Sequence, residues 1–344
     1  MDRSRTTNAP STAFAGVPRR SGKPMDMRQL DRTIAWRRDM GVRHAENARR
    51  LKPALHVSAC PACDGSDSAP FVEVYGFLYH ECAACGHLYL QNPPAHDDIA
   101  RLYQGATEQS HVYVGEDLFR RRVERVARPK ASFCAEHIAP GGLWFDMGCG
   151  TAELLSVVRE LGWEPRGCEA DPAHVDFARA RGIDVIRGYL SELPRELGAN
   201  VRVLSALNLL EHLPDPKPSL VRLTAPLAPG AHVVIEVPRH PSLSSFSNLL
   251  YPSLACRHIY PPDHLHIFTE ASLERVLDAA GLEARAVWVF GQDYQELIYS
   301  SAAHAGLGES AFFHRLLDGG GAIQRAIDAE DLCDVLFVVA VKPG

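Results

Sequence analysis

Residues 143–155 have the sequence LWFDMGCGTAELL, and this stretch decides the fold of the chain. A short apolar run ends in Asp146, glycines follow at positions 148 and 150, and a helical pattern of apolar residues then begins at Leu154. This order predicts a strand, a tight turn and a helix. Because glycine has no Cβ, Gly148 and Gly150 allow positive φ and let a ligand lie against the main chain. The stretch is therefore typical of a nucleotide-type binding turn.

The acidic residues of this turn distinguish between two kinds of ligand. A dinucleotide site has a third glycine where Glu153 stands, and Asp146 and Glu153 would both repel a pyrophosphate. S-adenosylmethionine has no phosphate and carries an ammonium and a sulfonium group, so carboxylates favour its binding. The alternative is that the stretch is one βαβ unit of some other doubly wound protein, with these acids as solvated strand ends.

A further acid follows the next predicted strand. Residues 165–168 are strand-like and lead into Glu169, 23 positions after Asp146. An acid at the tip of the second strand is placed to accept hydrogen bonds from both ribose hydroxyls, beside the point where strand order reverses. Asp146, Gly148, Gly150 and Glu169 together resemble the first two motifs of the class I S-adenosylmethionine-dependent methyltransferases. The resemblance implies that these four residues bind the cofactor.

Composition excludes several classes of protein. The chain has 344 residues and 46% hydrophobic residues, enough for two domains with a sizeable core. Its net charge of −6 gives no general attraction to nucleic acid. No apolar run reaches the roughly 20 residues that a membrane span needs, and the N-terminus lacks the apolar region of a signal peptide. We therefore expect a cytoplasmic protein.

Two segments precede the first cysteine. Residues 1–24 are rich in Arg, Ser, Thr, Pro and Ala and predict a disordered tail. Residues 25–56 predict a basic helical arm, in which Leu30, Ile34 and Met40 lie among many arginines. Two interpretations stay open for this arm: a solvated helix that packs on its own domain, or a contact for RNA or another anionic polymer.

Four cysteines form two Cys-x-x-Cys pairs that are separated by 18 residues. They are Cys60, Cys63, Cys82 and Cys85. An odd total of nine cysteines favours metal binding and free thiols over disulfides. Two pairs at this distance predict a tetrahedral four-thiolate zinc site, which is structural because no coordination position stays open. With short strands at 71–75 and 77–79, residues 57–92 are expected to form a zinc ribbon. The alternative, a redox pair, needs only one such motif.

The remainder of the chain predicts a helical linker and an α/β domain. The linker spans residues 93–138 and contains a helix from Glu116 to His137 that is interrupted near Pro129. From residue 139 to 344, strands alternate with helices, which predicts a Rossmann-like parallel sheet with right-handed crossovers. The expected strands are 143–145, 165–168, 184–186, 201–206, 232–237, 284–290 and 334–341.

Residues 292–333 form an insertion before the last predicted strand. Their pattern is helical, with a break expected at the three glycines 319–321. Insertions of this size usually serve as a functional cap or as a dimer surface. We therefore expect that a homodimer, if one forms, uses this segment.

The loop after the fourth strand supplies the first candidates for catalysis. This loop enters the gap between methyl donor and acceptor. Asn208 stands where many methyltransferases carry Asp, and it is a candidate for cofactor binding. Glu211-His212 resembles the Glu-His-Leu of small-molecule methyltransferases, and the imidazole of His212 is a candidate base. The alternative is a histidine that caps or packs under the sheet.

A second candidate lies in the long polar loop between residues 237 and 268. This loop follows the fifth strand, at the edge of the sheet where an acceptor is expected. Asp263 precedes His264 and is expected to orient or charge-balance an imidazole that removes the acceptor's proton. The alternative is a metal site formed by His258, His264 and His266.

The order of these parts is similar to that of the zinc-containing sugar methyltransferases, including C-methyltransferases of nucleotide-linked keto-deoxysugars. The resemblance covers roughly residues 58–290. It implies methyl transfer from S-adenosylmethionine to an oxygen or carbon of a sugar or similar small molecule, with His212 or His264 as the base. It also implies a role for Tyr113, in the linker after the ribbon. The chain departs from that family at Pro261, where the C-methyltransferases have tyrosine, and after Phe290, where they are longer.

Two other functions stay open. An rRNA methyltransferase would use the ribbon and the basic arm to hold RNA, although the acidic chain disfavours this. A catalytically inactive binding module with the same fold would use the ribbon for assembly. The expected partner is a small carbohydrate acceptor, without nucleic acid or membrane.

Overall fold

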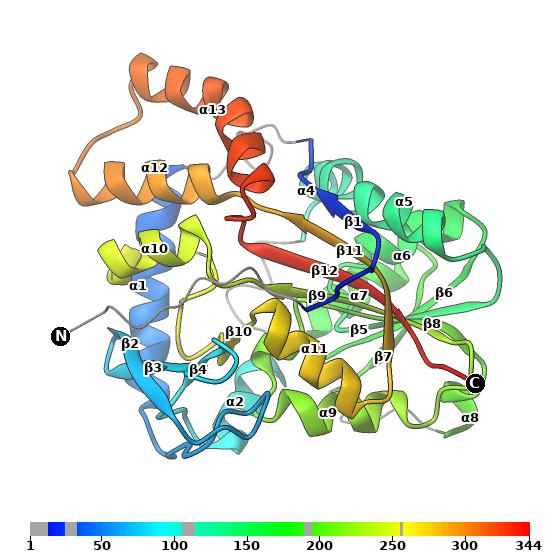
Figure 1. Ribbon diagram of the computed structural model, residues 1–344. Coiled ribbons are helices and arrows are strands. Elements are labelled where there is room, and N and C mark those ends of the chain that lie inside the picture. The colour runs from blue at the N-terminus through cyan, green and yellow to red at the C-terminus, as the bar shows by residue number, and fades with distance from the viewer. Residues whose placement is uncertain (1–12, 25–32, 105–113, 189–194, 255–256) are drawn as a thin grey trace.

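The computed structural model describes residues 13–24, 33–104, 114–188, 195–254 and 257–344. A mixed eight-stranded sheet runs through its centre with the order β1-β11-β12-β9-β8-β5-β6-β7 (Figure 1). The strands are β1 (Arg19–Ser21), β5 (Leu143–Met147), β6 (Glu164–Glu169), β7 (Asp184–Arg187), β8 (Val201–Leu207), β9 (His232–Pro238), β11 (Glu283–Phe290) and β12 (Val335–Val341).

Five of these strands form the parallel core of the sheet. β7, β6, β5, β8 and β9 pair in parallel, whereas β12 pairs antiparallel with both β9 and β11. Strand order reverses at β5, so the carboxyl ends of β5, β6 and β8 border the switch point where open α/β sheets bind ligands. The predicted Rossmann-like α/β fold is confirmed, and every strand predicted from residue 139 onward is present.

Residues 13–24 are ordered, whereas the sequence predicts a disordered tail up to residue 24. β1 lies at the edge of the sheet and pairs in parallel with β11, with Arg19 opposite Val287. Nε1 of Trp288 donates to the Gly22 carbonyl at 2.8 Å. The prediction is wrong for this segment because composition records only the lack of apolar side chains, while an open sheet edge holds a strand by main-chain hydrogen bonds. Residues 1–12 lie outside the described residues.

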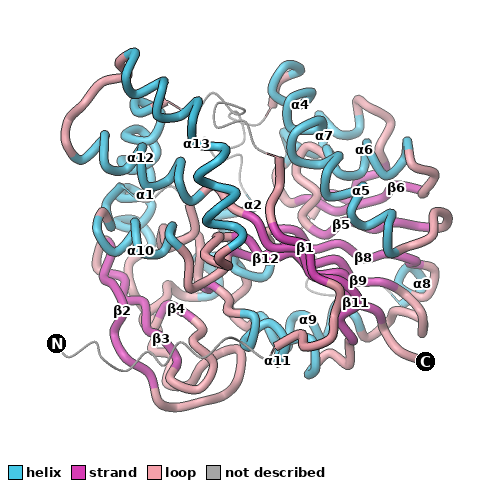
Figure 2. The backbone as a smooth tube through the Cα atoms, turned by 45° about the horizontal axis from the view of Figure 1, so that its top comes forward, coloured by secondary structure: helices cyan, strands magenta, loops and turns pink. Residues whose placement is uncertain are grey.

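Helices cover both faces of the sheet. On one face lie α4 (Glu116–Arg122), the π-helical turn η1 (Val123–Ala127), α5 (Arg128–His137), α6 (Glu153–Glu160) and α7 (Pro172–Arg179); on the other lie α9 (Pro216–Thr224) and α11 (Glu270–Ala279) (Figures 1 and 2). The helix predicted from Glu116 is not broken at Pro129. η1 precedes this proline and places it at the start of α5, where its missing N–H costs nothing.

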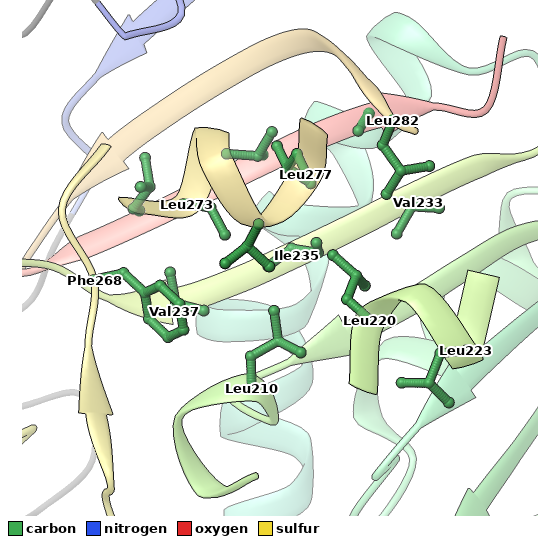
Figure 3. Close-up of a cluster of buried hydrophobic side chains, with 14 of the residues drawn as sticks. Leu210, Leu220, Leu223, Val233, Ile235, Val237, Phe268, Leu273, Leu277 and Leu282 are labelled. Carbon is green, nitrogen blue, oxygen red and sulfur yellow. The ribbon is translucent and has the colours of Figure 1, made fainter. Parts of the chain in front are cut away.

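Alternate residues of the strands fill two separate cores. On β9, Val233, Ile235 and Val237 pack against α9 and α11, while Val234 faces the opposite core. This alternation follows from the two-residue period of a strand. Figure 3 shows Leu273 and Leu277 of α11 above β9, with Leu220 and Leu223 of α9 beside it. The packing fixes both helices, and with them the loops at the carboxyl edge.

The ribbon forms a second sheet that is completed by a distant segment. Its strands are β2 (Ser68–Val74), β3 (Phe77–Cys82) and β4 (Leu88–Leu90), and β10 (His266–Ile267) pairs antiparallel with β4. The Thr269 hydroxyl donates to the Cys85 carbonyl at 2.5 Å. The ribbon is thus joined to the loop that carries His264, which the sequence does not predict because β10 has only two residues.

Four helices form a cap beyond the carboxyl ends of the central strands, beside the ribbon (Figures 1 and 2). They are α1 (Ile34–Leu51), α10 (Leu243–Leu250), α12 (Asp293–His304) and α13 (Ala311–Ala329). α12 contacts the other three, so α1, the helix of the basic arm, packs on the cap; residues 25–32 of the arm lie outside the described residues. The shorter segments are α2 (His96–Gln104), α8 (Arg195–Gly198) and the 3-10 turns η2 (Leu210–His212) and η3 (Pro252–Leu254).

The break expected at glycines 319–321 is absent, since α13 continues to Ala329. Each interior glycine costs about 1 kcal/mol relative to alanine. The Ser310 side chain caps the first turn, and Phe313 and Leu317 are buried against α12, which compensates for this cost. Within the described ranges, none of the helices combines the length and hydrophobicity that a transmembrane segment requires.

Candidate active site

The turn after β5 has the geometry of a ligand-binding loop. Gly148 and Gly150 have φ of 70° and 54°, and the N–H groups of Gly148 and Cys149 both donate to the Cys168 carbonyl at 3.0 Å. A Cβ at Gly150 would meet no atom within 4 Å, so the main chain borders open space there. A Cβ at Gly148 would lie 3.4 Å from Cδ1 of Leu209, which brings the loop after β8 against the turn.

Glu169 lies directly beside this turn, as the sequence predicts. One carboxylate oxygen accepts the Gly150 N–H at 2.9 Å, and the other accepts the Asp171 N–H at 2.9 Å. The carboxylate is partly exposed. It is therefore fixed in position and still accessible to hydroxyl donors from a ligand in the open space beside Gly150.

The other two acids of the turn, Asp146 and Glu153, are less able to attract a cation than the sequence suggests. Asp146 is buried, its Oδ1 accepts the Ser205 hydroxyl at 2.5 Å, and burial raises its pKa to about 7. Burial also raises the pKa of Glu153, but the ion pair with Arg122 outweighs this and leaves the pKa below its usual value. Among these three acids, Glu169 is therefore the one whose carboxylate a ligand can reach.

Asn208 is held by Glu236, which forms an ion pair with Lys130. Neither of these two residues is among the candidates predicted from the sequence. Its φ is 50°, its N–H donates to the Glu236 carbonyl at 2.9 Å, and its Nδ2 donates to Glu236 Oε1 at 3.1 Å. Nζ of Lys130 lies 2.5 Å from Glu236 Oε2, and both side chains are buried. A lone acid in the apolar strand β9 is a signal that could have revealed Glu236; Lys130, on a helix with many charges, offers no such signal.

The turn η2 presents Glu211 and His212 at the carboxyl edge. Leu210 anchors η2 in the apolar core (Figure 3). Nδ1 of His212 donates to the main-chain carbonyl of Asp263 at 2.7 Å, which leaves Nε2 without a proton in the neutral ring. Burial lowers the pKa of His212 to about 4, so the ring is neutral at physiological pH. The lone pair of the neutral ring is therefore on Nε2.

His264 lies against His212, and their ring centroids are 4.7 Å apart. Its Nδ1 donates to the His258 carbonyl at 2.8 Å, and its Nε2 accepts the Tyr260 hydroxyl at 2.5 Å. Burial holds the pKa of His264 well below its usual value. The predicted pairing of the Asp263 carboxylate with His264 is not observed, because both ring nitrogens already have these partners. Asp263 instead orients His212, through its carbonyl.

The alternative metal site formed by three histidines is not present. His266 Nε2 donates to the Leu213 carbonyl at 3.0 Å, and its Nδ1 lies 3.2 Å from Nε2 of His87. His266 therefore links the ribbon to η2, and both of its ring nitrogens are engaged in that link. Tyr113 lies outside the described residues.

The four ribbon cysteines converge in space. Sγ of Cys60 lies 3.7 Å from that of Cys85, and Sγ of Cys63 lies 3.6 Å from that of Cys82. Tetrahedral zinc with Zn–S bonds of about 2.3 Å places its sulfurs about 3.8 Å apart, so the arrangement fits a zinc ion. Every cysteine in the described ranges is a free thiol, which disfavours a redox disulfide.

A family model described as a methyltransferase domain matches residues 119–287, the segment from α4 to β11. No curated protein sequence matches the chain.

Solved structures with a similar fold are remote in sequence. A methyltransferase complexed with the Trm112 methyltransferase activator of Haloferax volcanii is 16% identical, with a TM-score of 0.49, over 69% of this chain and 99% of that one. A geranyl diphosphate C-methyltransferase from Streptomyces coelicolor is 12% identical, with a TM-score of 0.42, over 72% and 97%. The [4+2]-cyclase SpnF is 20% identical, with a TM-score of 0.44, over 64% and 82%.

The strand order, the glycine turn and the family match define residues 119–287 as a methyltransferase domain. The protein is a class I methyltransferase, an enzyme whose methyl donor is S-adenosylmethionine.

Proposed function

We propose that this enzyme transfers the methyl group to an oxygen or carbon of a small polar acceptor, a sugar or a nucleotide-linked sugar. One observation supports this most: two neutral imidazoles, His212 and His264, lie together in the loops after β8 and β9. Leu209, three residues before His212, touches the glycine turn. Proton-accepting groups thus stand on the acceptor side of the cofactor, as methylation of a hydroxyl or an acidic C–H requires.

The roles of the residues follow from their positions. Gly148 and Gly150 let the cofactor approach the main chain, and Glu169 accepts its ribose hydroxyls. Asp146 and Asn208, which bond to Ser205 and Glu236, hold the ends of β5 and β8 at the cofactor site. S-adenosylmethionine supplies an activated methyl group, so the protein contributes mainly alignment for an in-line displacement. His212 or His264 assists removal of the acceptor's proton. A zinc ion held by the four cysteines serves the ribbon structurally.

Substitution of the two histidines tests the proposal. S-adenosylhomocysteine release is measured across a panel of sugars and nucleotide sugars for the wild type, His212→Ala and His264→Ala. We expect kcat to fall by about 10²- to 10⁴-fold in at least one variant, with little change in S-adenosylhomocysteine affinity. His232→Ala, at the first residue of β9 and the opposite edge of the sheet, is the control. Full turnover in both histidine variants, or methylation of RNA and of no sugar, would contradict the proposal.

We further propose that the 292–333 insertion mediates a homodimer. Large apolar side chains are exposed on it: Leu307, Phe312 and Ile323, with exposed fractions of 58%, 69% and 44%. Burial of such side chains between two copies would stabilise the dimer. Light scattering is expected to give a dimer mass for the wild type and a monomer mass for Phe312→Ser. A monomeric wild type would rule this out.

A further inference from the structure

Three side chains of the kinds that bind metals converge beyond the carboxyl end of β8. One carboxylate oxygen of Glu211 and one ring nitrogen each of His212 and His264 lie within 4.8 Å of one another. In the described ranges only the four cysteines form another such group. The three residues come from two separate loops, so their proximity is a product of the fold and not of local sequence.

The described residues provide no hydrogen-bond donor for the Glu211 carboxylate. The residue is fully buried, and neither carboxylate oxygen has a hydrogen-bond partner among the described residues. The nearby Lys130 is already paired with Glu236. The Glu236 carboxylate would repel a negative charge on Glu211. An isolated buried carboxylate costs several kcal/mol, so it needs either a proton or a cation.

Both histidines are held as metal ligands usually are. Each donates Nδ1–H to a main-chain carbonyl, of Asp263 for His212 and of His258 for His264. This fixes the tautomer whose Nε2 carries the lone pair, and such carbonyl contacts typically orient ligating imidazoles. Tyr260, which donates to Nε2 of His264 at 2.5 Å, must release that nitrogen when a cation binds.

We propose that Glu211, His212 and His264 bind a divalent cation that holds two adjacent hydroxyls of the acceptor. Two imidazoles and one carboxylate suit Mn²⁺ and related first-row ions, and leave coordination positions open. The inference rests on the proposed function and restricts it to O-methylation of a carbohydrate with neighbouring hydroxyls. The imidazoles then assist removal of the acceptor's proton indirectly, by holding the cation that acidifies the hydroxyl.

The reaction balances without a further reagent. A hydroxyl bound to the cation loses its proton to water, because coordination lowers its pKa. The oxygen lone pair forms the new C–O bond while the S–CH₃ bond breaks, and that electron pair returns to sulfur. The products are the methyl ether, S-adenosylhomocysteine and one proton.

Manganese binding tests the site directly on the 344-residue protein purified with its zinc. Calorimetry and electron paramagnetic resonance are expected to show one Mn²⁺ per wild-type chain, since four thiolates are a poor site for this ion. Glu211→Gln is expected to weaken Mn²⁺ binding at least 10-fold while leaving S-adenosylhomocysteine affinity unchanged. Glu283→Gln, on an exposed part of β11, is the control. His264→Gln gives a second test if Glu211→Gln does not fold.

Two results would overturn the inference: a wild type that binds no Mn²⁺, or a Glu211→Gln protein that binds it as tightly. Its failure is distinguishable from failure of the proposed function. Sugar methylation that is fully retained after removal of divalent cations refutes only the cation site. Stoichiometric Mn²⁺ binding without methylation of any sugar refutes the proposed function and leaves the site intact.

Discussion

At the scale of single residues, we expect cofactor recognition to depend most on Glu169. Its carboxylate is held by the N–H groups of Gly150 and Asp171 and remains partly exposed, whereas Asp146 is buried and Glu153 is paired with Arg122. A charged acceptor that is already oriented loses little entropy when ribose hydroxyls bind to it.

Glu169→Gln is therefore expected to weaken S-adenosylhomocysteine binding by roughly 10- to 150-fold, because a hydrogen bond to a charged group contributes about 1.5–3 kcal/mol. Titration calorimetry measures the change. Glu164→Gln, exposed at the start of the same strand, should bind like the wild type. Equal affinity in the two variants would show that Glu169 does not contact the ligand.

Protonation of His266 is expected to lower the free energy of unfolding at acid pH. Burial lowers its pKa from 6.5 to about 4, so the unfolded chain binds a proton in this range that the folded chain refuses. Stability is therefore lost as pH falls below 6.5, by about 1.4 kcal/mol per pH unit. Relative to His266→Gln, the wild type should lose about 2 kcal/mol in urea unfolding between pH 6.5 and 5. A difference that does not change with pH would contradict this.

At the scale of elements, apolar patterns predict the central strands well and the short strands poorly. β5, β8 and β9 are buried on both faces, so their sequences are nearly continuous apolar runs. β1 and β10 have three and two residues, and main-chain pairing with distant strands determines them. The local sequence of a strand this short does not indicate which distant strand it pairs with.

The arm helix α1 is attached to α12 by a buried ion pair. Nη1 of Arg37 lies 2.5 Å from Glu296 Oε2, and the two side chains are 3% and 0% exposed. Arg37→Ala leaves a buried charge without its partner and should cost about 3–5 kcal/mol. Hydrogen exchange in α1 and α12 should then accelerate, while Arg38→Ala, on the exposed side of α1, serves as the control. Unchanged exchange in both variants would mean that the pair is not what holds the arm.

At the scale of the whole molecule, the proposed acceptor side of the site lies where the sheet and the ribbon meet. The hydrogen bonds from His87 to His266 and from His266 to the Leu213 carbonyl connect the ribbon to η2. The sequence predicts Glu169, His212 and His264 at this edge because strand ends and loops follow from the strand pattern. It does not predict the partners of the ring nitrogens or the isolation of Glu211, since these depend on where carbonyls of the 237–268 loop fall in space.

Loss of zinc should consequently impair methyl transfer to the acceptor more than binding of the cofactor. We expect metal analysis to find one zinc per wild-type chain and none in a Cys60→Ser/Cys85→Ser protein. The double variant should keep S-adenosylhomocysteine binding, since the glycine turn lies on the other sheet, and should lose methyl transfer because β10 and the His264 loop lose support. Equal zinc content in both proteins would contradict the four-cysteine site.

The central claim is that the turn after β5 binds a phosphate-free adenosine compound, S-adenosylmethionine or its product S-adenosylhomocysteine. Calorimetric titration of the purified protein with S-adenosylhomocysteine and, separately, with NAD tests it most directly. The structure predicts saturable binding of one S-adenosylhomocysteine per chain and no heat from NAD. Binding of NAD together with no response to S-adenosylhomocysteine would contradict it.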